Sequence, residues 1–335
     1  GLLPGDTVRY YARAIDNAPS GQAAVTREYV LRMPASTEMQ RAAEQQLEDV
    51  AEKLAELAEE AARRAEENRD QALENAAQPD TRGQEEGQPD FEQREELQAA
   101  LDNQEEMSAA ADSMRAELEE LERLMEEAGQ ADPGLSRELE ELQQLLRELT
   151  GSELEQRMDE MAEALDRDDL RQANESLSDL AEQQEAFRER LEEALERFRR
   201  AAVEQDFRAT TSEAEDLARL EEALANAMQE EDNPELRAEQ QQDLEARADQ
   251  LEAQMERLEE RLGDIEEQEA AAGVQEARES MQQAQEQMEQ AQQKANQGEN
   301  QEAADQAEEA AERLEDVAEQ LQQAQEQMAE QQAEA

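Results

Sequence analysis

Residues 170–198 read LRQANESLSDLAEQQEAFRERLEEALERF, and their apolar side chains return at steps of three, four or seven residues. This spacing lines the apolar side chains along one side of an α-helix, as in the heptad pattern of a coiled coil. Four heptads hold the register, through Leu170, Ala173, Leu177, Leu180, Phe187, Leu191, Ala194 and Phe198. The pattern predicts a long helix whose narrow apolar seam packs against another helix.

Seams of the same kind lie on both sides of this stretch. They occupy residues 47–61, 97–125 and 244–265. A residue at the seam of one helix packs between residues of a facing helix. We therefore expect pairing with other protein helices, from a second copy or from another coiled-coil protein. The side chains predicted to carry this pairing are Leu177, Leu180, Phe187, Leu191, Phe198, Leu251, Met255 and Leu258.

The end of the chain repeats itself. The heptapeptide QQAQEQM occurs at 282–288 and again at 322–328, and Asn-Gln-Gly-Glu-Asn lies between the copies at 296–300. Gly after a helical run is a stop signal. We therefore predict an antiparallel helical hairpin. Disorder is the alternative for these Gln-rich residues, because the segment is polar and strongly charged.

The composition excludes several classes of chemistry. Asp and Glu number 92 against 32 Lys and Arg, which gives a net charge of −60, and the chain has neither Cys nor His. Thiol nucleophiles, Ser-His-Asp triads and the usual zinc sites are therefore impossible within it. The negative charge opposes binding to nucleic-acid phosphates. The sequence predicts no catalytic residue, cofactor or metal site, and we expect a protein that is not an enzyme.

Residues 1–35 differ from the rest because they alternate with a period of two. Residues 7–15 and 25–32 are each predicted to be a strand. We expect the last two strands of a β-sandwich whose other strands lie upstream of Gly1, with a free-standing hairpin as the alternative. If this region binds a ligand, the side chains to test are Arg9, Arg13, Arg27 and Arg32.

Turn and cap signals divide the helical part. Gln-Pro-Asp occurs at 78–80 and at 88–90, which predicts a linker. Ser152, one of Asp168 and Asp169, and Asn233 are predicted to cap helices. The expected organisation is strands at 1–35, a coiled-coil helix at 36–77, a linker at 78–90, helical hairpins and coiled coil at 91–232, and coiled coil ending in a hairpin at 233–335.

Two passages carry a resemblance to a known family. The opening LLPGDTVRYYARAIDN with TREYVLRMP at 26–34, and MDEMAEALDRDDLRQANESLSDLAEQQEAFRERLEEALERFRR at 158–200, resemble a bacterial family of large uncharacterised membrane-anchored proteins. The closing hairpin with its Asn-Gln-Gly turn is also similar. The resemblance implies upstream transmembrane helices, an extracytoplasmic immunoglobulin-like β region and a Glu/Gln-rich helical tail. It brings no catalytic residues, because the family has no established activity.

These observations lead to one expected fold and one expected function. The fold is mostly α: long coiled coil and antiparallel helical hairpins, preceded by a two-stranded remnant of an immunoglobulin-like β-sandwich. The function is that of a non-enzymatic structural or interaction arm of a bacterial envelope protein, on the periplasmic or extracytoplasmic face of the membrane.

Membrane attachment is expected only through helices upstream of Gly1, because the sequence contains no run of 18 apolar residues and no signal peptide. The chain starts at Gly1 and not at Met, so we expect a fragment of a longer protein. Two alternative functions are a cytoplasmic coiled-coil scaffold of the chromosome-organising or cytoskeletal type, and a ligand-binding β module with a helical spacer.

Overall fold

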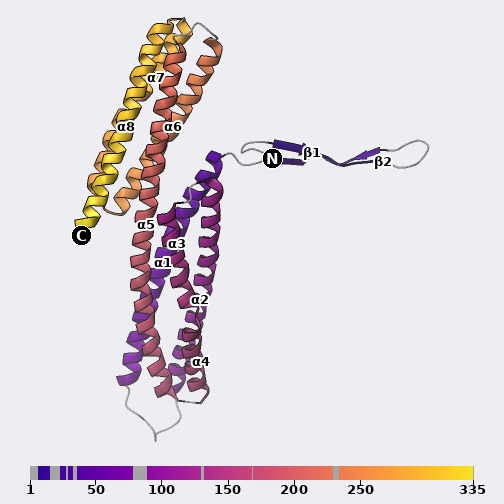
Figure 1. Cartoon of the computed structure of the whole chain (residues 1–335). Coiled ribbons are helices and arrows are strands. Elements are labelled where there is room, and N and C mark those ends of the chain that lie inside the picture. Colours follow the sequence, from indigo (N-terminus) through magenta and orange to yellow (C-terminus); the bar gives the residue numbers. More distant parts are fainter. Residues whose placement is uncertain are drawn as a thin grey trace. The chain divides into compact units, whose positions relative to one another are not determined.

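The computed structural model describes residues 7–15, 23–27, 29–32, 36–77, 89–129, 132–167, 169–228 and 234–334. Helices account for most of them, which confirms the predicted mostly-α fold (Figure 1). The predicted linker at 78–90 lies outside the described residues, except for its last two residues, which begin a helix. The elements are β1 Thr7–Tyr10, β2 Arg13–Ile15, β3 Ala23–Val25, β4 Tyr29–Arg32, α1 Ser36–Ala77, α2 Pro89–Ala128, α3 Pro133–Leu149, α4 Ser152–Asp166, α5 Leu170–Met228, α6 Pro234–Asp264, α7 Gln268–Gln297 and α8 Asn300–Glu334.

The strands form two short antiparallel ladders. β1 pairs with β4, Tyr10 facing Tyr29, and β2 pairs with β3, Arg13 facing Val25. The register differs by one residue between the ladders, so each predicted strand is interrupted and its alternation does not continue across the break. The main chain of Ala12 and Thr26 bridges the break with an N–H···O bond of 2.9 Å.

An immunoglobulin-like remnant is not seen. Within the described residues each ladder has only two strands, and no third strand joins either one. A sandwich needs two facing sheets with a shared apolar interior, which two narrow ladders do not provide.

The chain divides into two compact units, Gly1–Leu195 and Glu196–Ala335. The boundary falls inside α5, so neither unit coincides with the predicted segments 91–232 and 233–335. The reason is that α5 runs uninterrupted for 59 residues and contributes its first part to one unit and its last part to the other.

The first unit contains α1 to α4 and the beginning of α5. α1 packs against α2, and α3 lies beside α2. Two ion pairs show that α3 and α4 together run antiparallel to α5: Arg190 contacts Glu148 of α3 at 2.6 Å, and Arg157 of α4 contacts Asp179 at 3.1 Å. α3 and α4 therefore act as one helical segment that is broken at Gly151.

Local signals set several helix ends in this unit. The side chain of Asp132 accepts hydrogen bonds from the backbone N–H groups of Gly134 and Leu135, which caps α3. Asp169 caps α5 through the N–H of Gln172, as the sequence predicted. The predicted cap at Ser152 is wrong. Gly151 is the N-cap of α4, and Ser152 is already its first helical residue.

The second unit contains the end of α5 with α6, α7 and α8. Polar pairs set the antiparallel register of α6 and α7: Arg278 bonds to Glu259 at 2.6 Å, Gln285 to Asp249 at 3.1 Å. One continuous apolar core runs from Val203 to Met328 and takes residues from all four helical segments. The cooperation of four helices supplies the burial that an Ala-rich hairpin cannot reach alone.

α7 and α8 form the antiparallel hairpin that the sequence predicted. Gly298 ends α7 with a φ of 77°, a left-handed conformation that glycine adopts without steric cost, and its N–H bonds to Ala295. The two helices approach closely at Gly273, where an added Cβ would lie 2.8 Å from the Cβ of Ala324. The Gln-rich residues are therefore helical, and the disordered alternative is wrong for them.

Candidate functional site

The predicted partner seam is buried by the chain itself. Phe187 is the most exposed of its eight residues, at 6%, and the other seven are at 2% or less. Leu251, Met255 and Leu258 belong to the core of the second unit, with residues of α5, α7 and α8. The pattern therefore located the packing residues, but in this chain the helices that fill the seam come from the same molecule.

A buried polar layer interrupts the apolar packing of the first unit. Asn68 of α1, Gln104 of α2 and Gln184 of α5 are exposed by 4%, 0% and 1%. Asn68 donates its Nδ2–H to Oε1 of Gln184 at 2.9 Å, and Gln184 donates its Nε2–H to Oε1 of Gln104 at 2.8 Å. One amide thus joins three helices that are far apart in the sequence.

Each member of this layer stands where the heptad calls for an apolar residue. Gln184 lies seven residues after Leu177 and seven before Leu191. Asn68 and Gln104 hold the equivalent positions in α1 and α2. The signal was present in the sequence as polar residues at seam positions 104 and 184, and at 68, seven residues after the seam at 47–61 ends. The apolar pattern alone does not show that these three positions meet.

The layer fixes how the helices are aligned. If α5 slid along α1, three buried amides would lose their partners, and each buried polar group without a partner costs about 1–3 kcal/mol. A polar residue at a single core position specifies register in coiled coils in the same way. A second contact acts in the same sense, because Asn174 of α5 donates to the carbonyl of Ala72 in α1 at 3.0 Å.

The second unit has a polar pair in its core, and there the seam prediction was wrong by one residue. The apolar spacing of Leu217, Leu220, Leu224 and Met228 predicts Leu220 on the seam. Leu220 is instead 42% exposed, whereas its neighbour Glu221 is fully buried. Glu221 is seven residues from Ala214 and from Met228, so it occupies the core position. Its Oε1 accepts a hydrogen bond of 2.9 Å from Nε2 of Gln241, which is also buried.

The burial changes the acidity of this carboxyl group. The pKa of Glu221 is raised to about 7, chiefly because burial removes the carboxylate from water. The charge of nearby Glu245 also raises it, and the bond from Gln241 opposes the shift. Burial also raises the pKa of Glu245, and Glu289 and Asp249 add repulsion. The pKa of Glu221 therefore lies near neutral pH.

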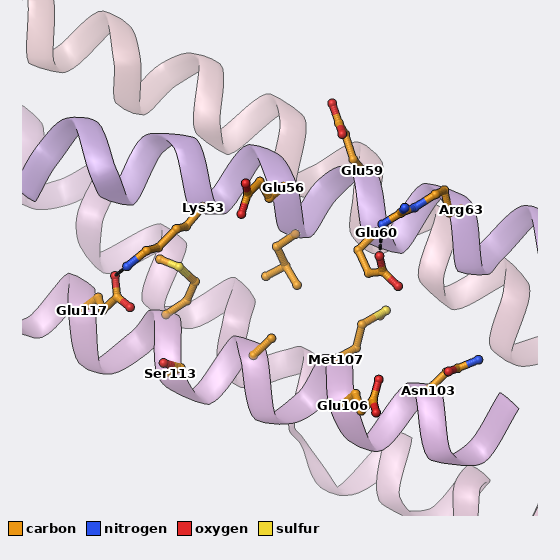
Figure 2. A pocket seen from close by; sticks show the side chains of 13 residues that line it. Lys53, Glu56, Glu59, Glu60, Arg63, Asn103, Glu106, Met107, Ser113 and Glu117 are labelled. Atoms are coloured by element: carbon orange, nitrogen blue, oxygen red, sulfur yellow. Dashed lines mark hydrogen bonds and ion pairs between the residues drawn. The ribbon is translucent and has the colours of Figure 1, made fainter. Parts of the chain in front are cut away.

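A groove with a volume of about 680 Å³ runs between α1 and α2 (Figure 2). Lys53 of α1 contacts Glu117 of α2 at 2.6 Å across it, and this bond raises the pKa of the lysine. Met107 and Met114 line its apolar part, and both are already buried. The rest of the lining is dominated by carboxylates. Such a groove can attract a cationic side chain.

No family model, curated protein or solved structure matches this chain. Among the described residues, no helix is both long enough and apolar enough to cross a membrane. Nor does any set of three or more acidic side chains in that part of the chain gather as ligands for a metal ion.

Proposed function

We propose that this chain is a non-enzymatic structural arm of a bacterial envelope protein. The observation that carries the proposal is the burial of all eight seam residues inside the chain's own bundles. Helices whose seams are filled internally form a self-sufficient spacer, and their outward face is left to the charged side chains. The buried layer of Asn68, Gln104 and Gln184 supports a fixed alignment, which a spacer needs.

The β ladders support the envelope part of the proposal. A ladder of two strands is marginally stable in water. Further strands of an immunoglobulin-like region would stabilise the two ladders. Together with the resemblance of residues 2–34 and 158–200 to membrane-anchored proteins, this favours an arm that projects from an extracytoplasmic β region.

The outer surface defines how such an arm would meet other molecules. The whole chain has 92 acidic and 32 basic side chains, so its surface repels anionic partners and attracts basic ones. The groove between α1 and α2 has the same bias, because Glu56, Glu59, Glu60 and Glu106 line it beside the Lys53–Glu117 pair. We therefore assign partner contact to the acidic faces and not to the heptad seams.

Protease accessibility tests the proposed location. The full gene product would carry a tag after residue 335, and spheroplasts of the host would be treated with protease before and after lysis. The envelope arm predicts that the tag is removed in intact spheroplasts while a cytoplasmic marker protein survives. Protection of the tag until lysis would overturn the proposal and favour the cytoplasmic scaffold.

A further inference from the structure

The pair formed by Glu221 and Gln241 is incomplete as a set of hydrogen bonds. One bond joins them, from Nε2 of Gln241 to Oε1 of Glu221 at 2.9 Å. The remaining oxygen of each group, Oε2 of Glu221 and Oε1 of Gln241, is buried and has no partner. Both are acceptors when the carboxyl group is ionised, so neither can satisfy the other.

A single proton completes the pair. A carboxylic acid and a primary amide can bond to each other twice, through N–H···O in one direction and O–H···O in the other. We propose that Glu221 and Gln241 form a proton-binding site in the second unit, where a proton taken from solvent onto Oε2 of Glu221 is donated to Oε1 of Gln241. The inference goes beyond the proposed function and does not depend on where the protein resides.

The charged groups around the pair favour the protonated form. Glu245 lies one helical turn after Gln241 in α6, and its Oε1 is also buried without a partner, while its Oε2 accepts a bond from Gln292 of α7 at 3.2 Å. Glu289 of α7 and Asp249 of α6 add negative charge beside Glu245. Binding a proton at Glu221 relieves part of this repulsion.

The nearby basic side chains are engaged with other groups. Arg237 donates to the carbonyl of Met228, and Arg247 contacts Glu213 of α5 at 2.8 Å. Lys294 at the end of α7 contacts Glu299 at 2.7 Å and also Glu302 of α8. Within the described residues of these helices, a proton is therefore the positive charge that Glu221 lacks.

The pair links stability to pH in a defined window. Burial raises the pKa of Glu221 from 4.5 to about 7. Below about pH 4.5 the folded and unfolded chains both hold the proton, and between 4.5 and 7 only the folded chain does. The contribution of the protonated pair to the free energy of unfolding is therefore complete below about pH 4.5. It falls as the pH rises from 4.5 to 7 and is lost above about pH 7. Across the window the unfolding constant of the second unit rises by about tenfold per pH unit.

The variant Glu221→Gln provides the sharpest test, because glutamine reproduces the neutral, doubly bonded pair at every pH. Glu222→Gln is the matched control, since it removes one charge from an exposed side chain in the same turn. The measurement is hydrogen exchange of the full chain at pH 6 and pH 8, corrected for intrinsic exchange rates, in peptides covering 214–228 and 241–251.

We expect protection in these peptides to fall by about tenfold from pH 6 to pH 8 in the wild type and in Glu222→Gln, and to stay constant in Glu221→Gln. Identical pH profiles in the wild type and Glu221→Gln would overturn the site. A second measurement needs only the wild type. The infrared band of a protonated carboxyl group should be present at pH 6 and absent above pH 8, and its absence at pH 6 would also overturn the site.

Discussion

Asn68, Gln104 and Gln184 place amides where apolar side chains would bury more surface. Their bonds of 2.9 and 2.8 Å offset the cost of removing these groups from water, although Nε2 of Gln104 keeps no partner. A fully apolar layer of similar volume is often as stable or more stable, so stability alone does not explain the layer. Its distinct contribution is a single permitted alignment of α1, α2 and α5.

At this scale we predict that Gln184→Ala destabilises the first unit by about 1–3 kcal/mol, because it leaves the amides of Asn68 and Gln104 buried without Gln184. The free energy of unfolding is measured by urea titration with circular dichroism. Glu182→Ala, at an exposed position of the same helix, is the control. Equal losses of unfolding free energy in the two variants would mean that the buried polar layer contributes no more to stability than an exposed side chain.

The helices themselves were largely predictable, since heptad spacing, proline and glycine signals act within a few residues. α6 begins at Pro234 and α7 ends before Gly298, as expected. What escaped prediction depends on tertiary contacts. Leu220 is exposed and Glu221 is buried because of the side of α5 that meets α6, which the sequence pattern does not reveal. The one-residue difference in register between the two β ladders likewise cannot be read from the alternation of residues.

Two glycines in helices give a matched test of packing at the scale of the element. Gly273→Ala places a methyl group 2.8 Å from the Cβ of Ala324, so α7 and α8 must separate, whereas nothing lies within 4 Å of the position in Gly263→Ala. We expect Gly263→Ala to stabilise the chain by about 0.5–1 kcal/mol through helix propensity.

Gly273→Ala has the same propensity gain but adds overpacking of about 1–3 kcal/mol, so a net loss of stability is expected. Thermal unfolding of the two variants beside the wild type measures the difference. A gain in Gly273→Ala equal to that in Gly263→Ala would show that the hairpin is not closely packed there.

The charge of the whole molecule works against its compactness. Many Arg–carboxylate pairs lie on the helix surfaces, but 92 acidic side chains face only 32 basic ones, so repulsion exceeds attraction. The seams, not the ion pairs, must then hold the bundles together, because exposed pairs contribute little.

Salt should therefore stabilise this protein. The screening length falls from about 30 Å at 0.01 M to about 3 Å at 1 M, and the repulsion is screened with it. We predict that the thermal midpoint and the helical signal in circular dichroism rise over this range. A fall would mean that attractive ion pairs dominate the electrostatics.

The claim that the seams are filled within one molecule is tested most directly by the mass of the chain in solution. Sedimentation equilibrium over a hundredfold range of concentration gives this mass, with circular dichroism recorded on the same samples. Seams that close within one molecule predict a monomer at every concentration, with a helical signal that does not change on dilution. A dimer or larger species that loses helicity as it dissociates would contradict this fold. It would support the alternative in which the seams pair between separate chains.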